Sequence, residues 1–185
     1  MTPKSRTRRE PPIRTRRLVL RPLTDADAFR IGALAGDWDV ARMTARIPYP
    51  YTSANAKHWI DDLVEGEVVR GIEHKGELIG LCGYVPAGKG AVEIGFWIGR
   101  PWWRQGFATE AVQALIGHCF GEAGVRRVIC GHFVDNPASA RVIAKLGFRF
   151  VGQDARWCEA RRQEVEALHY ERRRPFMARL GLRAA

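Results

Sequence analysis

Residues 93–111 combine two acidic side chains, three glycines and a series of NH donors where an expected strand meets an expected helix. The apolar run 91–98 has the length and composition of a strand, and residues 107–121 have those of a helix. The loop that leads into this helix, residues 103–109, includes Gly106 and leaves several backbone NH groups at the helix N-terminus. Aligned NH groups and the helix dipole bind phosphate, so we expect this segment to hold a phosphorylated ligand beside a sheet edge.

The cysteines and histidines show no spacing for a metal site. They are Cys82, Cys119, Cys130, Cys158, His58, His74, His118, His132 and His169. No two cysteines form a CxxC or other close pair, and the histidines are scattered, so we expect no metal and histidines that are structural or exposed. Cys82 and Cys130 fall in expected strands, where a reduced thiol packs as a small apolar side chain. Reduced thiols favour a cytoplasmic location.

Strands and helices must position this segment. Short apolar runs predict strands, and helical periodicity beside Ser, Thr or Asp caps predicts helices. The expected strands are residues 17–21, 67–73, 77–85, 91–98, 127–133, 148–151 and 165–173. The expected helices are residues 25–35, 37–45, 52–65, 107–121 and 136–146, with a loop at 155–164. This order, a meander followed by alternating helices and strands, predicts a mixed α/β sheet with helices on both sides.

The net charge of +10 lies at the two ends of the chain. Residues 1–21 hold eight Lys/Arg and one Glu, residues 156–185 hold eight Arg and four Glu, and the middle is close to neutral. We expect a disordered basic tail at 1–13, one folded domain at 14–175 and a second basic tail at 176–185. These ends are either solvated tails or attract an acidic partner such as RNA or a ribosome surface, although no RNA-binding motif accompanies them. No apolar run is long enough to span a membrane.

Four segments, in order and at consistent spacing, resemble the GCN5-related N-acetyltransferases (GNAT), and among them the RimJ/RimL type. Residues 17–27 (RLVLRPLTDAD) look like the first strand and helix of that type. Residues 93–98 (EIGFWI) look like its fourth strand, and residues 102–111 (WWRQGFATEA) look like its pyrophosphate loop. Residues 136–148, from Asn-Pro-Ala-Ser to Lys-Leu-Gly-Phe, resemble its second coenzyme-contacting helix. The resemblance covers residues 15–174.

The resemblance implies the α/β GNAT fold, a mixed central sheet of six to seven strands that is flanked by helices and splayed between the fourth and fifth strands. It implies acetyl-CoA as the donor and a primary amine as the acceptor. The amine would attack the thioester directly in a ternary complex, without an acyl-enzyme. The coenzyme would lie in the opening between the fourth and fifth strands.

Coenzyme contacts are implied on the fourth strand, on the following loop and on the second helix. The strand backbone at 96–98 would pair with the pantetheine amides, and an NH there would polarise the thioester carbonyl. Gly106 would let the loop approach the pyrophosphate closely, and Arg104 and Gln105 would offer side chains to it. The expected coenzyme contacts are Phe96, Trp97, Ile98, Trp103, Arg104, Gln105, Gly106, Phe107, Ala108, Thr109, Asn136 and Ser139.

Glu93, on the fourth strand, is the candidate general base. The acceptor must lose a proton before or during attack. At pH 7 the neutral form of an α-amine costs about 1–1.5 kcal/mol, whereas that of a lysine side chain costs about 4–5 kcal/mol. An α-amine therefore needs only a weak base or a water relay, and a carboxylate beside the coenzyme can serve as that base. The alternative is an exposed strand carboxylate with no role in the reaction.

Ser139 is the candidate proton donor to the leaving thiolate. Many family members carry a Tyr seven residues after the Asn that precedes this helix, but this chain has Ile143 there. Ser139 lies one turn earlier, and in the Rim type a Ser at this place resembles the thiolate-side donor. It could instead only hydrogen-bond the coenzyme or face the surface. Asn136 is expected to cap the helix and to contact pantetheine or substrate.

The acceptor stays open at this point. The first hypothesis is a protein or peptide N-terminal α-amine, as in the RimJ/RimL type, and the second is a small amine such as an antibiotic, polyamine or amino acid. The missing Tyr also permits a non-catalytic acyl-CoA-binding module, and the basic ends permit an RNA- or ribosome-associated protein. A monomer and a homodimer are both compatible with the sequence.

Overall fold

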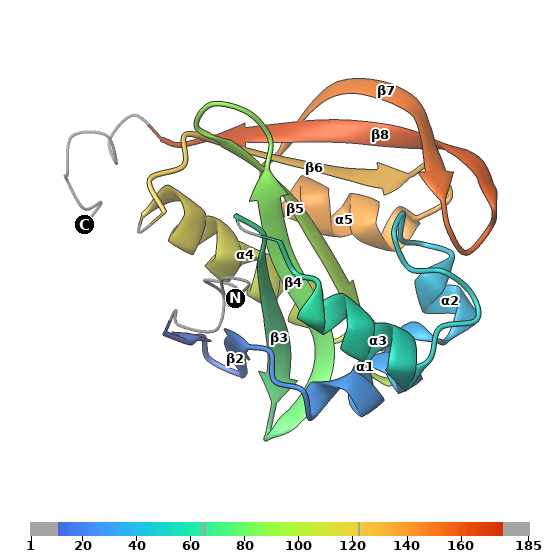
Figure 1. Cartoon of the computed structure of the whole chain (residues 1–185). Helices are drawn as coiled ribbons and strands as arrows, with labels where there is room; N and C mark the ends of the chain where they lie inside the picture. The colour runs from blue at the N-terminus through green and yellow to red at the C-terminus, as the bar shows by residue number, and fades with distance from the viewer. Residues whose placement is uncertain (1–10, 65, 122, 176–185) are drawn as a thin grey trace.

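A mixed eight-stranded β-sheet carries helices on both faces (Figure 1). The computed structural model describes residues 11–175 except residues 65 and 122. The strands are β1 (Ile13–Arg14), β2 (Leu18–Pro22), β3 (Val68–His74), β4 (Glu77–Pro86), β5 (Ala91–Ile98), β6 (Arg127–Phe133), β7 (Arg149–Cys158) and β8 (Gln163–Arg173). The helices are α1 (Asp27–Ala35), α2 (Trp38–Ala41), α3 (Ser53–Asp61), α4 (Phe107–Phe120) and α5 (Pro137–Lys145), with a 3₁₀ turn η2 (Arg100–Trp102) before α4.

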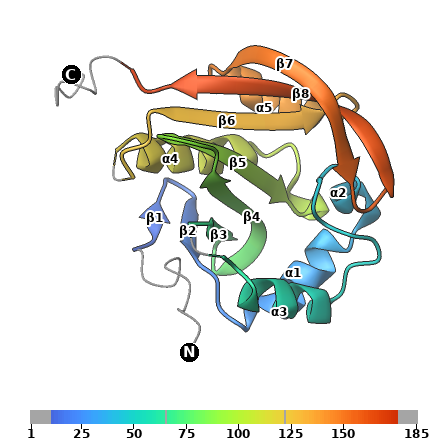
Figure 2. The same cartoon turned by 45° about the horizontal axis from the view of Figure 1, so that its top comes forward.

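The sheet opens between β5 and β6. The strand order is β1-β2-β3-β4-β5-β6-β8-β7, and β5 and β6 are the parallel neighbours in it. These two strands pair at residues 91–93 and 127–129 and then diverge, as both views show (Figures 1 and 2). β5 stays paired with β4 as far as Ile98. The expected opening between the fourth and fifth strands is therefore confirmed, and it leaves the edge of β5 at residues 94–98 without β6 beside it.

Helices α4 and α5 pack on one face of the sheet. The buried side chains of α4 recur at helical spacing, and Leu115 and Ile116 are almost fully buried. They share one cluster with Ile94 and Ile98 of β5, and Phe96 packs against the same cluster. Burial of this apolar stripe fixes α4 directly beside the opening.

Helices α1 and α3 pack on the opposite face. Ile31 of α1 and Ile60 of α3 share a second buried cluster with Leu78 and Leu81 of β4, and Trp97 packs against it. Side chains alternate between the faces of a strand. Glu93 therefore lies on the face of α1 and α3, together with Trp97, whereas Ile94 and Phe96 face α4.

Strands β7 and β8 form a long hairpin that bends toward α2 (Figure 2). Near its turn, Cys158, Ala160 and Ala167 pack against Ala41 of α2. The expectation of a strand at 148–151 followed by a loop at 155–164 was wrong, because β7 continues to Cys158 and the turn is confined to 159–162. Most β7 side chains are exposed, so the strand lacks the apolar alternation that identifies strands in a sequence.

Smaller differences concern the N-terminal half. The seven expected strands are present, and the structure adds the short β1, which pairs with β2. The helix expected at 37–45 is only one turn long, and the helix expected at 52–65 ends at Asp61. Thr52 caps α3 in a capping box with Asn55.

The expected tails lie almost wholly outside the described residues. Residues 1–10 and 176–185 are not described, and Ile13, placed in the N-terminal tail, instead pairs with Leu20. None of the described helices combines the length and the apolar character needed to cross a membrane.

All four cysteines are buried free thiols. Burial raises the pKa of Cys82 and of Cys130 to about 12, so both thiols are protonated and unreactive at neutral pH.

Candidate active site

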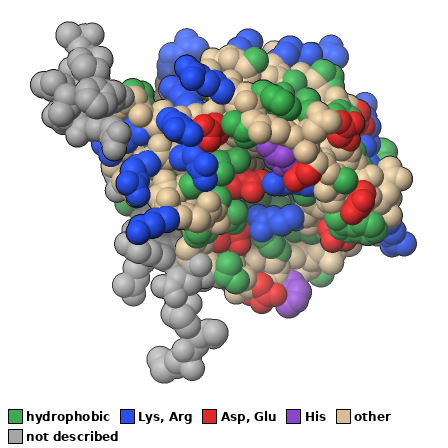
Figure 3. All heavy atoms as spheres, turned by 90° about the horizontal axis from the view of Figure 1, so that it is seen from above, with side chains coloured by type: hydrophobic (Ala, Val, Ile, Leu, Met, Phe, Trp, Pro, Cys, Tyr) green, Lys and Arg blue, Asp and Glu red, His purple; other side chains and the backbone are tan. Residues whose placement is uncertain are grey.

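A cavity of about 590 Å³ lies where β5 and β6 diverge. It brings together five of the residues expected at the site, Glu93, Phe96, Trp97, Asn136 and Ser139. The further Arg, Glu and His side chains in its walls are Arg46, Glu67, His132 and Arg156. Seen from above, acidic, basic and histidine side chains meet near the middle of the molecule (Figure 3).

Glu93 forms an ion pair across the cavity with Arg156 of β7. Arg156 Nη1 donates to Glu93 Oε1 at 2.6 Å, and both side chains are about one-third exposed. The bend of the β7–β8 hairpin carries Arg156 toward β5, although β6 and β8 lie between the two strands in the sheet. The candidate base therefore faces the cavity with a fixed cationic partner.

The ion pair continues into a short charged network. Arg156 Nε lies 3.8 Å from Asp154 Oδ1, and the same carboxylate oxygen lies 2.6 Å from His169 Nε2. The hydrogen bond with His169 lowers the pKa of Asp154. Arg156 thus has two carboxylates within reach, one in the cavity and one on its own strand.

The N-terminus of α5 contributes to the cavity from the α4 and α5 side. The Asn136 side-chain oxygen accepts from the backbone NH of Ser139 at 3.0 Å, which confirms Asn136 as the helix cap. Asn136 is buried and Ser139 is partly exposed, and both line the cavity. Ile143, at the position of the usual Tyr, is almost fully buried in the core. Glu93 and Ser139 therefore reach the same space from opposite faces of the sheet.

The loop before α4 presents a helix N-terminus at the end of β5. Arg104 and Gly106 have φ angles of 62° and 78°, in the left-handed region. Gly106 is the N-cap of α4, whose first NH groups have no acceptor within the helix. The Trp103 indole donates to the carbonyl of Ile98 at 2.6 Å and ties the loop to β5. This expected anion site lies beyond the cavity, not in its walls.

Contacts with Arg17 brace the same loop. Its guanidinium donates to the Gln105 carbonyl at 3.0 Å and to Glu110 Oε2 at 2.6 Å, and it lies over the Phe107 ring. Burial opposes ionisation of Glu110, but hydrogen bonds from Thr15 and Arg17 outweigh it and lower the pKa of Glu110. Phe107 was expected to contact the coenzyme, but its side chain is buried, so only its backbone can make this contact.

The remaining loop residues differ in what they present. Ala108 and Thr109 lie in the first turn of α4, and the Gln105 side chain donates to the Pro101 carbonyl at 3.3 Å. That bond turns Gln105 back onto the preceding turn, so its backbone is better placed than its side chain to meet a phosphate.

His132 is a wall residue that the sequence did not single out. Its Nδ1 lies 2.8 Å from the Phe133 carbonyl, which assigns the proton to Nδ1, and its Nε2 lies 3.3 Å from the Tyr170 hydroxyl. The two rings stack with centroids 5.5 Å apart. A buried imidazole held at both ring nitrogens in this way shapes the wall of the cavity on the β6 side.

Sequence reasoning also missed Arg46, Glu67 and Arg156. Glu67 is buried, and its Oε1 accepts from Arg46 Nη2 at 2.8 Å. No local motif marks any of the three, because each reaches the cavity from a segment remote in sequence from residues 93–139. Arg156 moreover falls in the segment expected to be a loop.

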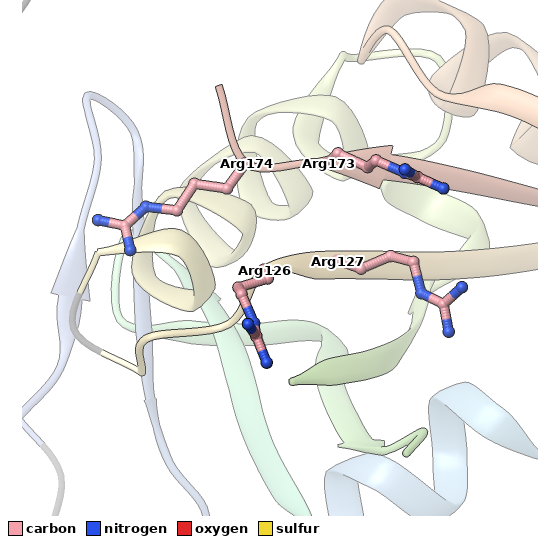
Figure 4. A pocket seen from close by; sticks show the side chains of 4 residues that line it. All are labelled: Arg126, Arg127, Arg173 and Arg174. Carbon is pink, nitrogen blue, oxygen red and sulfur yellow. The ribbon is translucent and has the colours of Figure 1, made fainter. Parts of the chain in front are cut away.

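A second, smaller hollow of about 330 Å³ is lined by Arg126, Arg127, Arg173 and Arg174 (Figure 4). It lies where β6 begins and β8 ends, at the opposite end of β6 from His132. Figure 4 shows the four guanidinium groups fanning outward and not converging on one point. Glu171 pairs with Arg127 at 3.6 Å and with Arg173 at 2.9 Å. This hollow is basic and separate from the cavity.

The chain is similar to known acetyltransferases. Residues 17–149 match the family model described as an acetyltransferase (GNAT) domain. The uncharacterized N-acetyltransferase YoaA of Bacillus subtilis is 30% identical over 161 residues, which are 77% of this chain and 85% of YoaA. The ribosomal-protein-serine acetyltransferase of Escherichia coli is 38% identical over 79 residues, 41% of this chain and 44% of that enzyme.

Solved structures share the fold. A RimL ribosomal L7/L12 α-N-protein acetyltransferase, solved in complex with coenzyme A, superposes with a TM-score of 0.76 over 88% of this chain and 98% of RimL, at 18% identity. The family model and the YoaA match together carry the assignment. The chain belongs to the GNAT family and is an N-acetyltransferase that uses acetyl-CoA as its acetyl donor.

Proposed function

We propose that this chain acetylates the N-terminal α-amine of a protein or peptide, in the manner of the RimJ/RimL enzymes. The observation that carries the proposal is the cavity that Glu93 enters from one face of the sheet and Ser139 from the other. An α-amine is partly neutral at pH 7, so a single carboxylate beside the opening is sufficient to take up its proton. The partial match to a ribosomal-protein-serine acetyltransferase supports this acceptor class.

Donor binding is assigned to the exposed edge of β5 and to the α4 loop. Acetyl-CoA supplies the thioester. Backbone groups at 96–98 would pair with the pantetheine amides, and an NH near Phe96 or Trp97 would stabilise the developing oxyanion. NH groups at 103–109 would hold the pyrophosphate, because two left-handed residues and a helix N-terminus direct donors outward there. The Ile98 carbonyl already accepts from Trp103, so it is the least available of these groups.

The transfer requires one proton to leave the amine and one to reach the thiolate. As the new C–N bond forms and the C–S bond breaks, Glu93, directly or through water, accepts the amine proton. Ser139 Oγ donates its proton to the departing sulfur, in place of the missing Tyr, and regains one from water, while Glu93 releases the amine proton to water. Arg156 holds the Glu93 carboxylate in the cavity before the acceptor arrives.

A small-molecule amine is the second candidate acceptor. The observation that favours it is the closure of the β7–β8 hairpin onto the segment after α2. Cys158 Sγ donates to the Thr44 carbonyl at 3.3 Å, and the Glu159 NH donates to the Ala45 carbonyl at 3.0 Å. These contacts cover part of the acceptor face and restrict the size of what can enter.

Acetyl transfer to a panel of acceptors separates the two candidates. Purified protein is mixed with acetyl-CoA and with an N-terminal peptide library, blocked peptides carrying only lysine amines, polyamines, aminoglycosides or free amino acids. Thiol release gives the rates and mass spectrometry gives the acetylated position. We expect the highest kcat/KM with free α-amines of peptides. Transfer only to polyamines or aminoglycosides would refute the peptide assignment.

We further propose that residues 14–175 form one catalytic domain of a cytoplasmic enzyme, which is a monomer or a homodimer. Its basic tails bind weakly to an acidic or ribosomal partner. The sequence of both tails is basic, and the C-terminal tail follows Arg173 and Arg174 of the arginine hollow. Fanned guanidiniums suit several separate phosphates better than one bound anion.

A further inference from the structure

An arginine beside the candidate base is unexpected in a site for amines. A protonated amine that approaches Glu93 also approaches Arg156, whose Nη1 is 2.6 Å from the same carboxylate. Like charges at this separation repel each other, and Arg156 competes with the amine for Glu93. Arg156 is therefore either a fastener for the hairpin or a contact for an anionic part of the acceptor.

The surroundings of Arg156 favour an acceptor contact. The side chain lines the cavity and is about one-third exposed, so its guanidinium can reach a bound molecule. Asp154 lies 3.8 Å from Nε, and this second carboxylate keeps Arg156 partly neutralised when its bond to Glu93 opens. The hairpin has other fastenings near its turn, because Arg161 donates to the Arg42 carbonyl at 2.7 Å and pairs with Asp135 at 2.9 Å. Arg156 is not needed for that attachment.

An acidic group on the acceptor resolves the competition. If that group takes the place of Glu93 on Arg156, the Glu93 carboxylate is released toward the amine. A planar guanidinium binds carboxylates and phosphates with two parallel hydrogen bonds. Arg156 therefore loses few or no hydrogen bonds when the acidic group of the acceptor replaces Glu93. Because Arg156 and Glu93 are in contact, the acidic group and the amine must lie only a few bonds apart in the acceptor.

We propose that the acceptor is an amine with an acidic group a few bonds away, and that Arg156 selects it. The proposal rests on the acetylation of an amine beside Glu93 proposed above. Two sources share this chemistry, a peptide whose first residue is Asp or Glu and a free α-amino acid with its own carboxylate. Arg156 acts as a specificity residue, and the proton transfers remain those assigned to Glu93 and Ser139.

Isosteric acceptor pairs test the proposal directly. The value of kcat/KM is measured for peptides beginning with Asp or Asn and with Glu or Gln, and for a free amino acid against its amide. The wild-type protein, R156Q, R156K and R149Q are compared, since Arg149 is an exposed arginine of the same strand that does not line the cavity. Circular dichroism and melting temperature confirm that each variant is folded.

Wild type and R149Q should prefer the acidic member of at least one pair by roughly 10- to 100-fold, the usual range for a charge-assisted hydrogen bond. In R156Q the ratio of kcat/KM values should fall to about one, mainly because kcat/KM for the acidic acceptor decreases. R156K should keep part of the preference. The pair that shows the preference distinguishes a peptide from a free amino acid.

Four outcomes would overturn the assignment. If the wild-type protein acetylated both members of every pair at equal rates, the proposed preference for an acidic acceptor would be wrong. If R156Q kept the wild-type ratio of kcat/KM between acidic and neutral acceptors, Arg156 would not be the selecting residue. If kcat/KM fell equally for both acceptors of a pair in R156Q and in R156K, Arg156 would have only a structural role. If no amine is acetylated while acetyl-CoA still binds, the proposed function itself fails, and this inference fails with it.

Discussion

Glu93 and Ser139 reach one cavity from opposite faces of the sheet, and this placement is the chemical centre of the account. Glu93 was expected on β5, and its face follows from the structure, because Trp97 on the same face packs against the cluster of α1 and α3. The pattern could not predict its partner, because Arg156 is 63 residues away in sequence and lies in a strand without apolar alternation. The role of Ser139 was expected only through the family resemblance, whereas the Asn136 cap of its helix carries a local signal.

Replacing Glu93 by Gln should lower the acetylation rate most at low pH. Without the carboxylate, the reaction depends on amine that is already neutral, and that fraction rises about tenfold per pH unit until the amine pKa near 8. We expect a loss of about 10²-fold at pH 6.5, within the range for general-base catalysis, with partial recovery by pH 8.5. The measurement is kcat/KM for one α-amine peptide across this range. An unchanged profile would exclude Glu93 as the base.

Replacing Ser139 by Ala should lower kcat and leave acetyl-CoA affinity nearly unchanged, because the side chain is assigned to the departing sulfur. A matched variant is N136A, which removes the cap of α5 and should cost about 1 kcal/mol of stability. Steady-state kinetics, calorimetric binding and thermal unfolding separate the two effects. Wild-type turnover of S139A would remove Ser139 from the mechanism.

At the level of elements, the junction of β5, η2 and α4 was the best predicted part of the molecule. The strand, the turn and the helix each carry local signals, and Gly106, expected to allow a close approach to the pyrophosphate, adopts a positive φ. The β7–β8 hairpin was the worst predicted part. Its side chains are mostly exposed, and its shape is set by packing against α2, a contact between distant segments.

Two glycines of α4 give a matched test of the loop. Gly106 needs a left-handed backbone, so G106A should weaken acetyl-CoA binding by roughly tenfold and cost about 1–3 kcal/mol of stability. Gly117 lies within the helix, and an added Cβ would meet no atom within 4 Å, so G117A should stabilise the protein by about 0.5–1 kcal/mol. Calorimetry and thermal unfolding measure both. Unchanged coenzyme affinity in a folded G106A protein would contradict the assigned loop.

At the level of the whole molecule, composition and element order were enough to predict an α/β sheet with helices on both faces. The opening between β5 and β6 was expected only through the family resemblance, because no residue pattern signals where paired strands separate. The excess charge at the chain ends was visible in the sequence. The arginine hollow was not, since it joins the start of β6 to the end of β8.

The basic surface should show itself in salt-dependent binding to an acidic partner. Exchanging the hollow's four arginines for glutamine should weaken cosedimentation with ribosomes at about 50 mM salt, and wild-type binding should itself fall steeply by about 200 mM. The acetylation of a short neutral peptide should not change, because the hollow is remote from the cavity. Binding that is insensitive to both salt and substitution would remove this surface as the contact.

The decisive measurement is a crystal structure of the protein with coenzyme A, because it shows whether the coenzyme occupies the opening between β5 and β6. We expect pantetheine paired with the β5 backbone at 96–98, pyrophosphate on the NH groups at 103–109, and the sulfur between Glu93 and Ser139. Coenzyme bound elsewhere, or bound with its sulfur away from both residues, would refute the proposed site.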